Sequence, residues 1–317
     1  MTPAALLKVE SGGLLTTVQD LGRVGQQRSG MTVAGAMDSF AASVSNLLLG
    51  NERGAAVLEI TLLGPTLRFV AAARISLCGG DLSAMLDGKL LPLWKTVTVQ
   101  AGQQLSFGRR RSGARAYLVV AGGFAVPKVL GSRAAYLRGK VGGLEGRPLR
   151  SGDVLSGFVL LTAAGERGLR PQDIPAYDSP AILRVLPGPH REHFSGTSQE
   201  AFFRDVYTVS PQSDRQGYRL SGPGAMRQSL EDILSEPMPL GGIQIPPDGQ
   251  PILLMADRQP TGGYPLIGVV ISADIPRAGQ LAPGDSVSFV PVALEEAVKA
   301  AMKVESRLRL LELLCLP

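Results

Sequence analysis

Short apolar segments separated by glycine and proline constrain the fold of this chain more than any other feature. Helix formers are sparse in the middle of the chain, and its 39 glycines and 23 prolines are spaced as turn residues. Short strands bounded by turn residues are typical of a mainly β protein, which we therefore predict. Between residues 55 and 123 the predicted strands are 57–60, 66–70, 74–78, 84–86, 96–99, 104–107 and 116–120.

Turn signals recur in both halves of the chain. Asp-Gly pairs at 87–88 and 248–249 are hairpin signals, because a tight turn needs residues that tolerate positive φ. A glycine turn followed by an alternating strand recurs in AGQQLSF (101–107), SGDVLSG (151–157) and PGDSVSF (283–289). This recurrence fits two related β-rich lobes, and it also fits coincidence among short hairpin signals.

Three segments have helical patterns. Asp38 stands at an N-cap position before the apolar pattern that starts at Phe40, and that helix is expected to end at Gly50-Asn51. A short helix is expected at 198–204, and the one long helical pattern covers 294–314. Residues 14–18 and 182–186 are predicted to be strands.

The domain organisation follows from a polar, proline-containing stretch without periodicity at 163–180. We predict an N-terminal β-rich lobe at 1–165, a linker at 166–180, a C-terminal β-rich lobe at 181–293 and a C-terminal helix at 294–317.

Charge and composition exclude several classes of function. Residues 1–165 hold 18 Lys/Arg and 9 Asp/Glu, a net charge of +9, and residues 166–317 hold 14 and 18, a net charge of −4. Aromatic residues make up only 5%, which argues against nucleic-acid binding, and complementary lobes or an anionic substrate or partner explain the charge asymmetry at least as well. No signal peptide or membrane span is evident, and the two cysteines are far apart, so we expect a cytoplasmic protein.

The richest candidate site is the segment 257–264 between the apolar runs 252–255 and 267–271. It contains Asp257, Arg258 and Tyr264, together with an amide, a hydroxyl and the pair Gly262-Gly263. Two adjacent glycines let a backbone approach a ligand or take positive φ, and functional residues concentrate on such loops. The alternative is a hairpin turn in which the Asp–Arg pair is only a local salt bridge.

Two further clusters combine Asp with Arg near glycine: Gln19-Asp20 with Arg23, and Ser213-Asp214-Arg215 with Arg219. Each pair taken alone is more often structural, but three such clusters together favour a cleft that handles anions. The sequence contains no serine-nucleophile motif and no nucleotide-binding P-loop, and His190 and His193 have no cysteine nearby, so no metal site is expected.

Motifs along nearly the whole chain resemble the family called allophanate hydrolase subunit 2, also described as the biotin-dependent carboxyltransferase family or as the C subunit of 5-oxoprolinase. The motifs are TTVQDLGRVG (16–25), GAMD (35–38), GNERGAAVLEITLLGP (50–65), YLVVAGGF (117–124), GSR (131–133), SDRQGYRL (213–220), GGIQIPPDGQPILLMADRQPTGGYP (241–265) and QLAPGDSVSF (280–289).

The resemblance implies a cyclophilin-like β-barrel architecture and a heteromeric complex. The implied partners are the B subunit of 5-oxoprolinase, which is like allophanate hydrolase subunit 1, and an A subunit of the lactam-utilisation type. The implied activity opens 5-oxo-L-proline to L-glutamate with ATP and Mg used by the complex and no cofactor held tightly by this chain. Alternatives are the carboxyltransferase component of a urea carboxylase or allophanate-type system, which needs biotin from a partner, and a non-catalytic protein that binds a kinase-inhibitor-like partner.

The chain departs from the family pattern at Gln216, where Met is usual, at Pro260, where Thr is usual, and at Ala134-Ala135, where Ser-Thr is usual. We predict Asp257, Arg258 and Tyr264 as catalytic. The predicted substrate-binding residues are Gln19, Asp20, Asp38, Asp214, Arg215, Arg219, Gln244, Thr261, Gly262 and Gly263.

Overall fold

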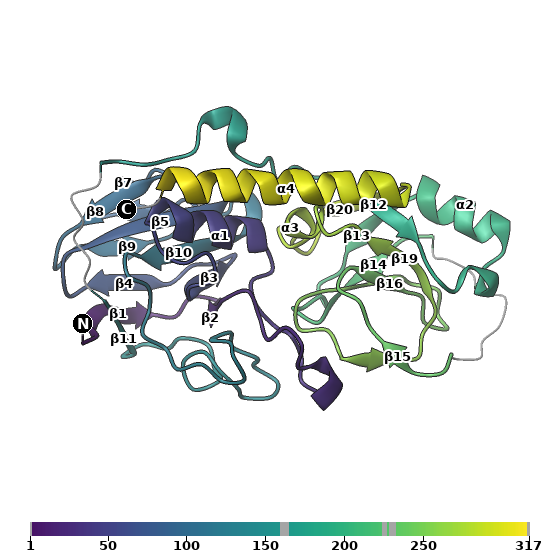
Figure 1. Ribbon diagram of the computed structural model, residues 1–317, viewed down its shortest axis with the longest axis horizontal. Helices are drawn as coiled ribbons and strands as arrows, with labels where there is room; N and C mark the ends of the chain where they lie inside the picture. Colours follow the sequence, from purple (N-terminus) through teal and green to yellow (C-terminus); the bar gives the residue numbers. More distant parts are fainter. Residues whose placement is uncertain (1, 159–164, 224–226, 228–232, 316–317) are drawn as a thin grey trace. The chain divides into compact units, whose positions relative to one another are not determined.

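The computed structural model describes residues 2–158, 165–223, 227 and 233–315, and it is mainly β, as predicted (Figure 1). The chain forms two compact units, and neither is a single stretch of sequence. The first unit comprises Met1–Arg23, Ala34–Ala176 and Ser306–Pro317. The second unit comprises Val24–Val33 and Tyr177–Glu305.

The first unit contains two antiparallel sheets. Its strands are β1 (Ala4–Ser11), β2 (Leu15–Gln19), β3 (Val57–Thr61), β4 (Thr66–Phe69), β5 (Ala73–Asp81), β6 (Met85–Leu86), β7 (Lys89–Leu90), β8 (Thr96–Val99), β9 (Gln104–Ser106), β10 (Ser112–Val120) and β11 (Val154–Gly157). One sheet has the order β11-β1-β4-β9-β6-β7, and the other has the order β2-β3-β10-β5-β8. The seven strands predicted between residues 55 and 123 are all present.

One apolar core lies between these sheets. It takes Leu67 and Phe69 from β4 and Leu118 and Val120 from β10, all fully buried. Side chains alternate along β4, so its polar residues face away from the core. The middle strands β5 and β10 are buried along almost their whole length, because the core covers one face and helix α1 (Ser39–Leu48) packs on the other.

Helix α1 begins where the sequence predicts. The Asp38 side chain accepts a hydrogen bond from the Ala41 N–H at 2.8 Å, which satisfies one of the free donors of the first turn. The helix ends at Leu48, and Gly50 then takes a positive φ of 71°. All of its residues except Ser39 are buried.

The second unit is built on a closed seven-stranded barrel, which confirms the predicted cyclophilin-like barrel architecture. The strand order is β12-β19-β16-β17-β14-β13-β20, and a parallel pairing of β12 with β20 closes the ring. The strands are β12 (Ala181–Pro187), β13 (Val206–Val209), β14 (Gly217–Ser221), β16 (Gly242–Gln244), β17 (Ile252–Leu254), β19 (Leu266–Val270) and β20 (Ser286–Pro291).

Helix α2 (Gly196–Arg204) confirms the predicted short helix and packs against β20. Its Phe202 stacks on Phe289 with ring centroids 4.9 Å apart, and Tyr207 contacts both rings. These fully buried aromatic side chains contribute a large part of the apolar area that holds the helix on the barrel. The second unit also contains the short helix α3 (Ile275–Ala278).

The predicted turns are present. Asp87 and Gly88, with φ of 48° and 78°, join β6 to β7 directly. Asp248-Gly249 lies in the longer connection between β16 and β17, which form an antiparallel pair. In the three recurrent segments, Gly102, Gly152 and Gly284 all take φ near 90°, and each precedes a strand (β9, β11 and β20).

The segment 257–264 is not a hairpin turn. The strands that flank it, β17 and β19, are not neighbours, because both pair with β16, which lies between them. The connection therefore crosses one end of β16. It contains the strand β18 (Thr261–Gly262), which pairs with β15 (Glu236–Pro237) in a separate two-stranded sheet.

The C-terminal helix α4 (Leu294–Cys315) matches the helical pattern, and its residues divide between the two units after Glu305. Within the stretch expected as a linker, the Arg167 carbonyl accepts from the Thr96 N–H, and the Leu169 N–H donates to the Trp94 carbonyl. Strand β1 was not predicted. None of the helices in the described part of the chain is both long and apolar enough to cross a lipid bilayer.

Candidate functional site

A pocket of about 200 Å³ lies in the second unit, against the neighbouring strands β14, β16 and β17. Ile252 and Leu254 of β17 supply apolar contact, and the other side chains bring a carboxylate, a guanidinium, amides and a phenol. Four of the predicted site residues line it: Asp214, Arg219, Gln244 and Tyr264. The remaining lining residues are Gln216, Gly217, Ile252, Leu254 and Gln259.

Asp214 is held in place by the turn before β14. Its Oδ1 accepts hydrogen bonds from the backbone N–H of Gln216 at 2.8 Å and of Gly217 at 3.3 Å, a turn that Asp forms readily. The carboxylate is exposed, so a solute reaches it without displacing protein. Arg219 follows two residues into the strand, and its side chain is exposed as well.

Gln244 is the buried polar group of the pocket. Only 2% of this residue is exposed, and its Nε2 donates to the thioether sulfur of Met238 at 3.2 Å, a weak acceptor. No other hydrogen bond of this amide joins it to the described residues. A buried amide with unused hydrogen-bonding capacity is costly unless something else satisfies it.

Gly262 makes room for two of the amides that line the pocket. A Cβ at this position would lie 2.7 Å from the Gln259 Nε2 and 2.8 Å from the Gln244 Nε2. The residue therefore serves close approach, which the sequence offered as one alternative. It is not among the described glycines with positive φ, and neither is Gly263, whose carbonyl accepts from the Ile233 N–H. Thr261 is exposed and pairs with Pro237 in the small sheet.

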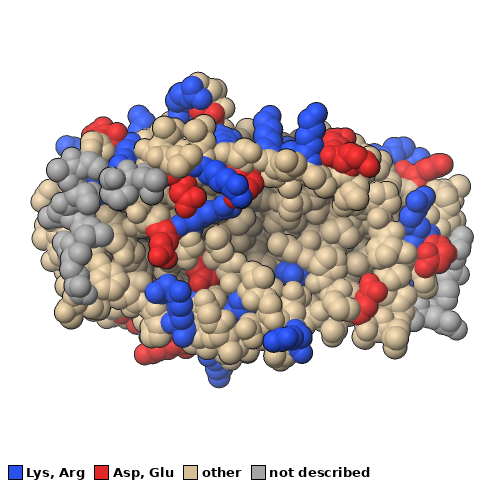
Figure 2. Space-filling model, viewed as in Figure 1, with Lys and Arg blue, Asp and Glu red and all other residues tan. Residues whose placement is uncertain are grey.

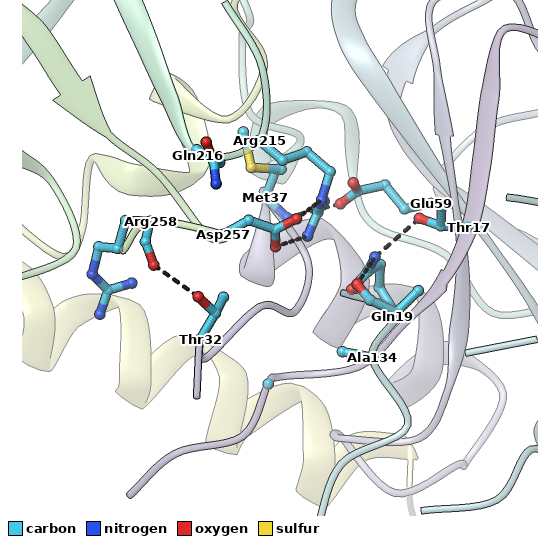
Figure 3. A network of polar contacts seen from close by, with 12 residues as sticks. Thr17, Gln19, Thr32, Met37, Glu59, Ala134, Arg215, Gln216, Asp257 and Arg258 are labelled. Carbon is cyan, nitrogen blue, oxygen red and sulfur yellow. Dashed lines mark hydrogen bonds and ion pairs between the residues drawn. The ribbon is translucent and has the colours of Figure 1, made fainter. Parts of the chain in front are cut away.

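Asp257 pairs with Arg215 and not with the adjacent Arg258 (Figure 3). Both nitrogens of the fork donate to the carboxylate, Nε to Oδ2 at 3.1 Å and Nη2 to Oδ1 at 3.0 Å, and both side chains are more than 90% buried. The Asp257 N–H also donates to the Arg215 carbonyl at 2.8 Å. The alternative of a local Asp257–Arg258 salt bridge is therefore wrong, because the carboxylate is engaged by a residue 42 positions earlier.

Arg258 holds the loop through backbone groups. Its Nε donates to the Met238 carbonyl at 2.9 Å, and its own carbonyl accepts from the Thr32 hydroxyl at 3.0 Å. Figure 3 shows its guanidinium directed away from Asp257. Burial lowers the pKa of this guanidinium, because desolvation disfavours the charged form. Among the described residues, neither Asp257 nor Arg258 belongs to the pocket lining.

In the first unit, the Gln19-Asp20 cluster is hydrogen-bonded to the GSR motif (131–133) and to Ala135, which follows it. Asp20 Oδ1 accepts from the Ser132 hydroxyl at 2.6 Å and from the Gly22 N–H at 2.8 Å, and Asp20 Oδ2 accepts from the Arg133 N–H at 2.5 Å. Gln19 Nε2 donates to the Ala135 carbonyl at 3.1 Å. Two motifs more than 100 residues apart in the sequence thus form one buried network.

The Arg23 guanidinium completes this network by donating to the carbonyls of Val129 and Ala134. Both alanines of Ala134-Ala135 are fully buried, so this departure from the family pattern lies inside the network and not on a surface.

Asp38 belongs to a second buried network that the sequence did not predict. Its N–H donates to the Tyr117 hydroxyl at 2.8 Å, and that hydroxyl donates to Glu59 Oε2 at 2.9 Å, which also accepts from the Met37 N–H. Burial raises the pKa of the Tyr117 phenol well above its usual value, with Glu59 adding to the effect. The signal for Glu59 was a carboxylate in the middle of the apolar strand VLEIT, every residue of which is buried.

Neither the surface charge nor the placement of His, Cys, Asp and Glu in the described part of the chain points to a further site. On the face that Figure 2 shows, Lys and Arg are interspersed with Asp and Glu. Among the described residues, no group of three or more His, Cys, Asp or Glu is arranged to hold a metal ion. His190 uses its Nδ1 to accept from the Leu266 N–H at 3.1 Å.

The fold, a closed β-barrel in one unit and two antiparallel sheets in the other, is shared with solved enzyme structures. Residues 29–291 match the family described as carboxyltransferase domain, subdomain A and B, and the chain belongs to this family.

Relatives within the family are enzymes and enzyme subunits. The protein of Escherichia coli (strain K12) that is named as the C subunit of 5-oxoprolinase is 40% identical over 295 residues, which are 93% of this chain and 94% of that protein. The urea amidolyase of Saccharomyces cerevisiae is 35% identical over 92% of this chain, but the match spans only 17% of that protein. The crystal structure of the Kluyveromyces lactis urea carboxylase superposes with a TM-score of 0.87 at 31% identity, over 98% of this chain and 29% of that one.

Proposed function

We propose that this chain is one subunit of an ATP-dependent 5-oxoprolinase that opens 5-oxo-L-proline to L-glutamate. The observation that carries the proposal is the match to the C subunit of 5-oxoprolinase, because it covers more than nine tenths of both chains at 40% identity. In this proposal the cytoplasmic partners are a B subunit and an A subunit of the lactam-utilisation type, and the assembly uses ATP with Mg.

The pocket of the second unit suits the proposed substrate. A lactam presents one planar N–H and one carbonyl, and amide side chains pair with both groups. Gln244 offers such an amide from a buried position, and Gln259 and Gln216 offer others from the rim. Ile252 and Leu254 provide apolar contact for ring carbons.

The three residues predicted as catalytic take different parts in this proposal. Tyr264 lines the pocket and contacts substrate directly. Asp257 and Arg258 are positioning residues, because they tie the loop that carries Tyr264 to Arg215, Met238 and Thr32.

A second candidate is the carboxyltransferase part of a urea carboxylase, with biotin supplied by another chain. The similarity to the Kluyveromyces lactis urea carboxylase favours it, since the match covers 98% of this chain. Urea is also a planar amide, so the same amide side chains serve either substrate.

The experiment is to co-express the chain with its cognate subunits and to measure two activities. We expect ATP hydrolysis that depends on 5-oxo-L-proline and releases L-glutamate, and no turnover by the single chain. Biotin-dependent carboxylation of urea without lactam-dependent ATP hydrolysis would instead establish the second candidate.

The role of Tyr264 is tested in the same assembly with Tyr264→Phe, which we expect to lower turnover by about tenfold or more, since a directed hydrogen bond to substrate is lost. Tyr207→Phe is the matched control, because the buried Tyr207 hydroxyl has no hydrogen-bond partner among the described residues. Equal turnover of both variants and wild type would remove Tyr264 from the site.

A further inference from the structure

The pocket of the second unit is lined by one acidic and one basic side chain that do not pair with each other. Asp214 and Arg219 both line it, and both are exposed. Within the described part of the chain, no ion pair engages the Arg219 guanidinium, and the Asp214 carboxylate accepts only backbone N–H groups, through Oδ1. Each side chain is therefore available to a charged or polar group of a ligand.

The buried amide of Gln244 is an independent sign of a ligand. It lines the same pocket while only 2% exposed, and its only protein partner among the described residues is the Met238 thioether. A neutral planar group that donates and accepts hydrogen bonds would satisfy this amide.

The size of the pocket limits the ligand to a small molecule. Its volume of about 200 Å³ lies below the roughly 300–1,000 Å³ typical of sites for drug-sized ligands. A ligand that engages Arg219, Asp214 and Gln244 together combines a carboxylate, an N–H or ammonium group and an amide within the size of an amino acid.

We propose that this pocket distinguishes a lactam with a carboxylate from uncharged amides, with Arg219 binding the α-carboxylate, Asp214 facing the nitrogen and Gln244 facing the lactam carbonyl. This inference rests on the proposed function for its substrate, but the pocket carries the assignment of groups. Urea and 2-pyrrolidinone lack the carboxylate, so they leave the Arg219 guanidinium without its partner.

The same arrangement retains the product. When the lactam C–N bond breaks, a new C–O bond forms to the water oxygen, and the nitrogen takes one water proton. The new carboxylic acid then passes its proton to this amine, so L-glutamate carries an ammonium group where the lactam had a neutral N–H. A charge-assisted contact with Asp214 is stronger than a contact with a neutral N–H, and L-glutamate is therefore an inhibitor that competes for this pocket.

The test is calorimetric titration of the purified chain with 5-oxo-L-proline, L-glutamate, 2-pyrrolidinone and urea. We expect the two carboxylated ligands to bind at least about tenfold more tightly than the two uncharged ones, since a hydrogen bond to a charged group is worth a factor of this order. Arg219→Gln should abolish that difference. Asp214→Asn, which keeps the oxygen that accepts the turn N–H groups, should weaken L-glutamate about tenfold more than it weakens 5-oxo-L-proline.

Two matched variants control for charge. Arg204→Gln removes an exposed arginine that pairs with Asp205, and Asp248→Asn alters a carboxylate that accepts from the Gln250 N–H as Asp214 accepts from Gln216. Neither residue belongs to the pocket lining, and both variants should bind like wild type.

Absence of binding, equal binding of all four ligands, or wild-type selectivity in Arg219→Gln would overturn the inference. Failure of the proposed function is a separate outcome. An assembly that turns over 5-oxo-L-proline while Arg219→Gln keeps full selectivity refutes only the inference. A chain that binds amino acids selectively while its assembly shows no lactam-dependent ATP hydrolysis refutes only the proposed function.

Discussion

Asp20 in the first unit and Asp214 in the second unit look alike in the sequence, since each lies near glycine and arginine in a polar turn. In the structure Asp20 is 7% exposed, and both of its oxygens accept hydrogen bonds from the chain itself. Asp214 is exposed and only its Oδ1 is engaged, by two N–H groups of its own turn.

The two tyrosines differ in the same way. The hydroxyl of Tyr117 is fully buried between the Asp38 N–H and Glu59, whereas Tyr264 is half-buried at the pocket. The same residue type can therefore stabilise the scaffold or contact a ligand. What distinguishes the two roles is whether other groups of the chain satisfy the hydrogen bonds of the side chain.

The largest expected loss of stability concerns Asp257, which lies in the same unit as the pocket but has the hydrogen-bonding of a scaffold residue. Asp257 is in the second unit but is satisfied like Asp20, because it pairs with the buried Arg215. Asp257→Ala removes one partner of a buried ion pair together with its two charge-assisted hydrogen bonds, so we expect a loss of about 3–5 kcal/mol in the free energy of unfolding by chemical denaturation. The exposed Asp248→Ala should stay within about 0.5 kcal/mol of wild type. A loss below about 1 kcal/mol for Asp257→Ala would mean that this carboxylate is not part of the scaffold.

Removing the hydroxyl of each tyrosine tests the contrast between Tyr117 and Tyr264 directly. Tyr117→Phe removes the hydroxyl that accepts from the buried Asp38 N–H and donates to Glu59, and it should lower the free energy of unfolding by about 1–3 kcal/mol. Tyr264→Phe should change it by less than about 0.5 kcal/mol while affecting ligand binding or turnover. Equal thermal shifts for the two variants would contradict the distinction between scaffold and pocket.

Helix N-caps give a smaller contrast between the units. Asp38 caps α1 and is fully buried, whereas Ser195 caps α2 by accepting from the Ser198 N–H at 3.1 Å and is half-buried. Asp38→Ala should cost about 1–2 kcal/mol and Ser195→Ala about 0.5–1 kcal/mol, measured by denaturant midpoints. The reverse order would show that burial does not set the strength of these caps.

The smallest effect concerns pH. The hydrogen bonds from Arg147 lower the pKa of Asp153, which accepts from both Nη1 and Nη2 of that side chain. Because the folded pKa lies below the unfolded value of about 3.9, the stabilisation is present at pH above that value and is lost as pH falls through the folded pKa. The difference in thermal midpoint between wild type and Asp153→Asn should therefore shrink below about pH 4. A difference that stays constant from pH 7 to pH 3 would contradict this assignment.

Local features were predicted well from the sequence because each depends on a few neighbouring residues. Asp38 marks the start of α1, Asp87-Gly88 forms the predicted turn, and the strands from β3 to β10 other than β7 lie where apolar segments predicted them. Four of the predicted site residues line one pocket, since three of them lie on or beside the barrel strands β14 and β16. Strand β1 was missed, and so were Glu59 and Tyr117, whose partner Asp38 was predicted only as a cap and substrate ligand.

By itself the sequence determined that the chain is mainly β, that it belongs to its family, and where most strands, turns and caps occur. Only the tertiary structure decided which polar residues meet, as when Asp257 pairs with Arg215 and Asp20 receives the hydroxyl of Ser132, 112 residues later. It also decided that the segment 257–264 crosses β16 instead of forming a hairpin. The physical reason is that turn and strand preferences act over a few residues, whereas partners across a barrel are set by the strand order that buries the whole apolar surface at once.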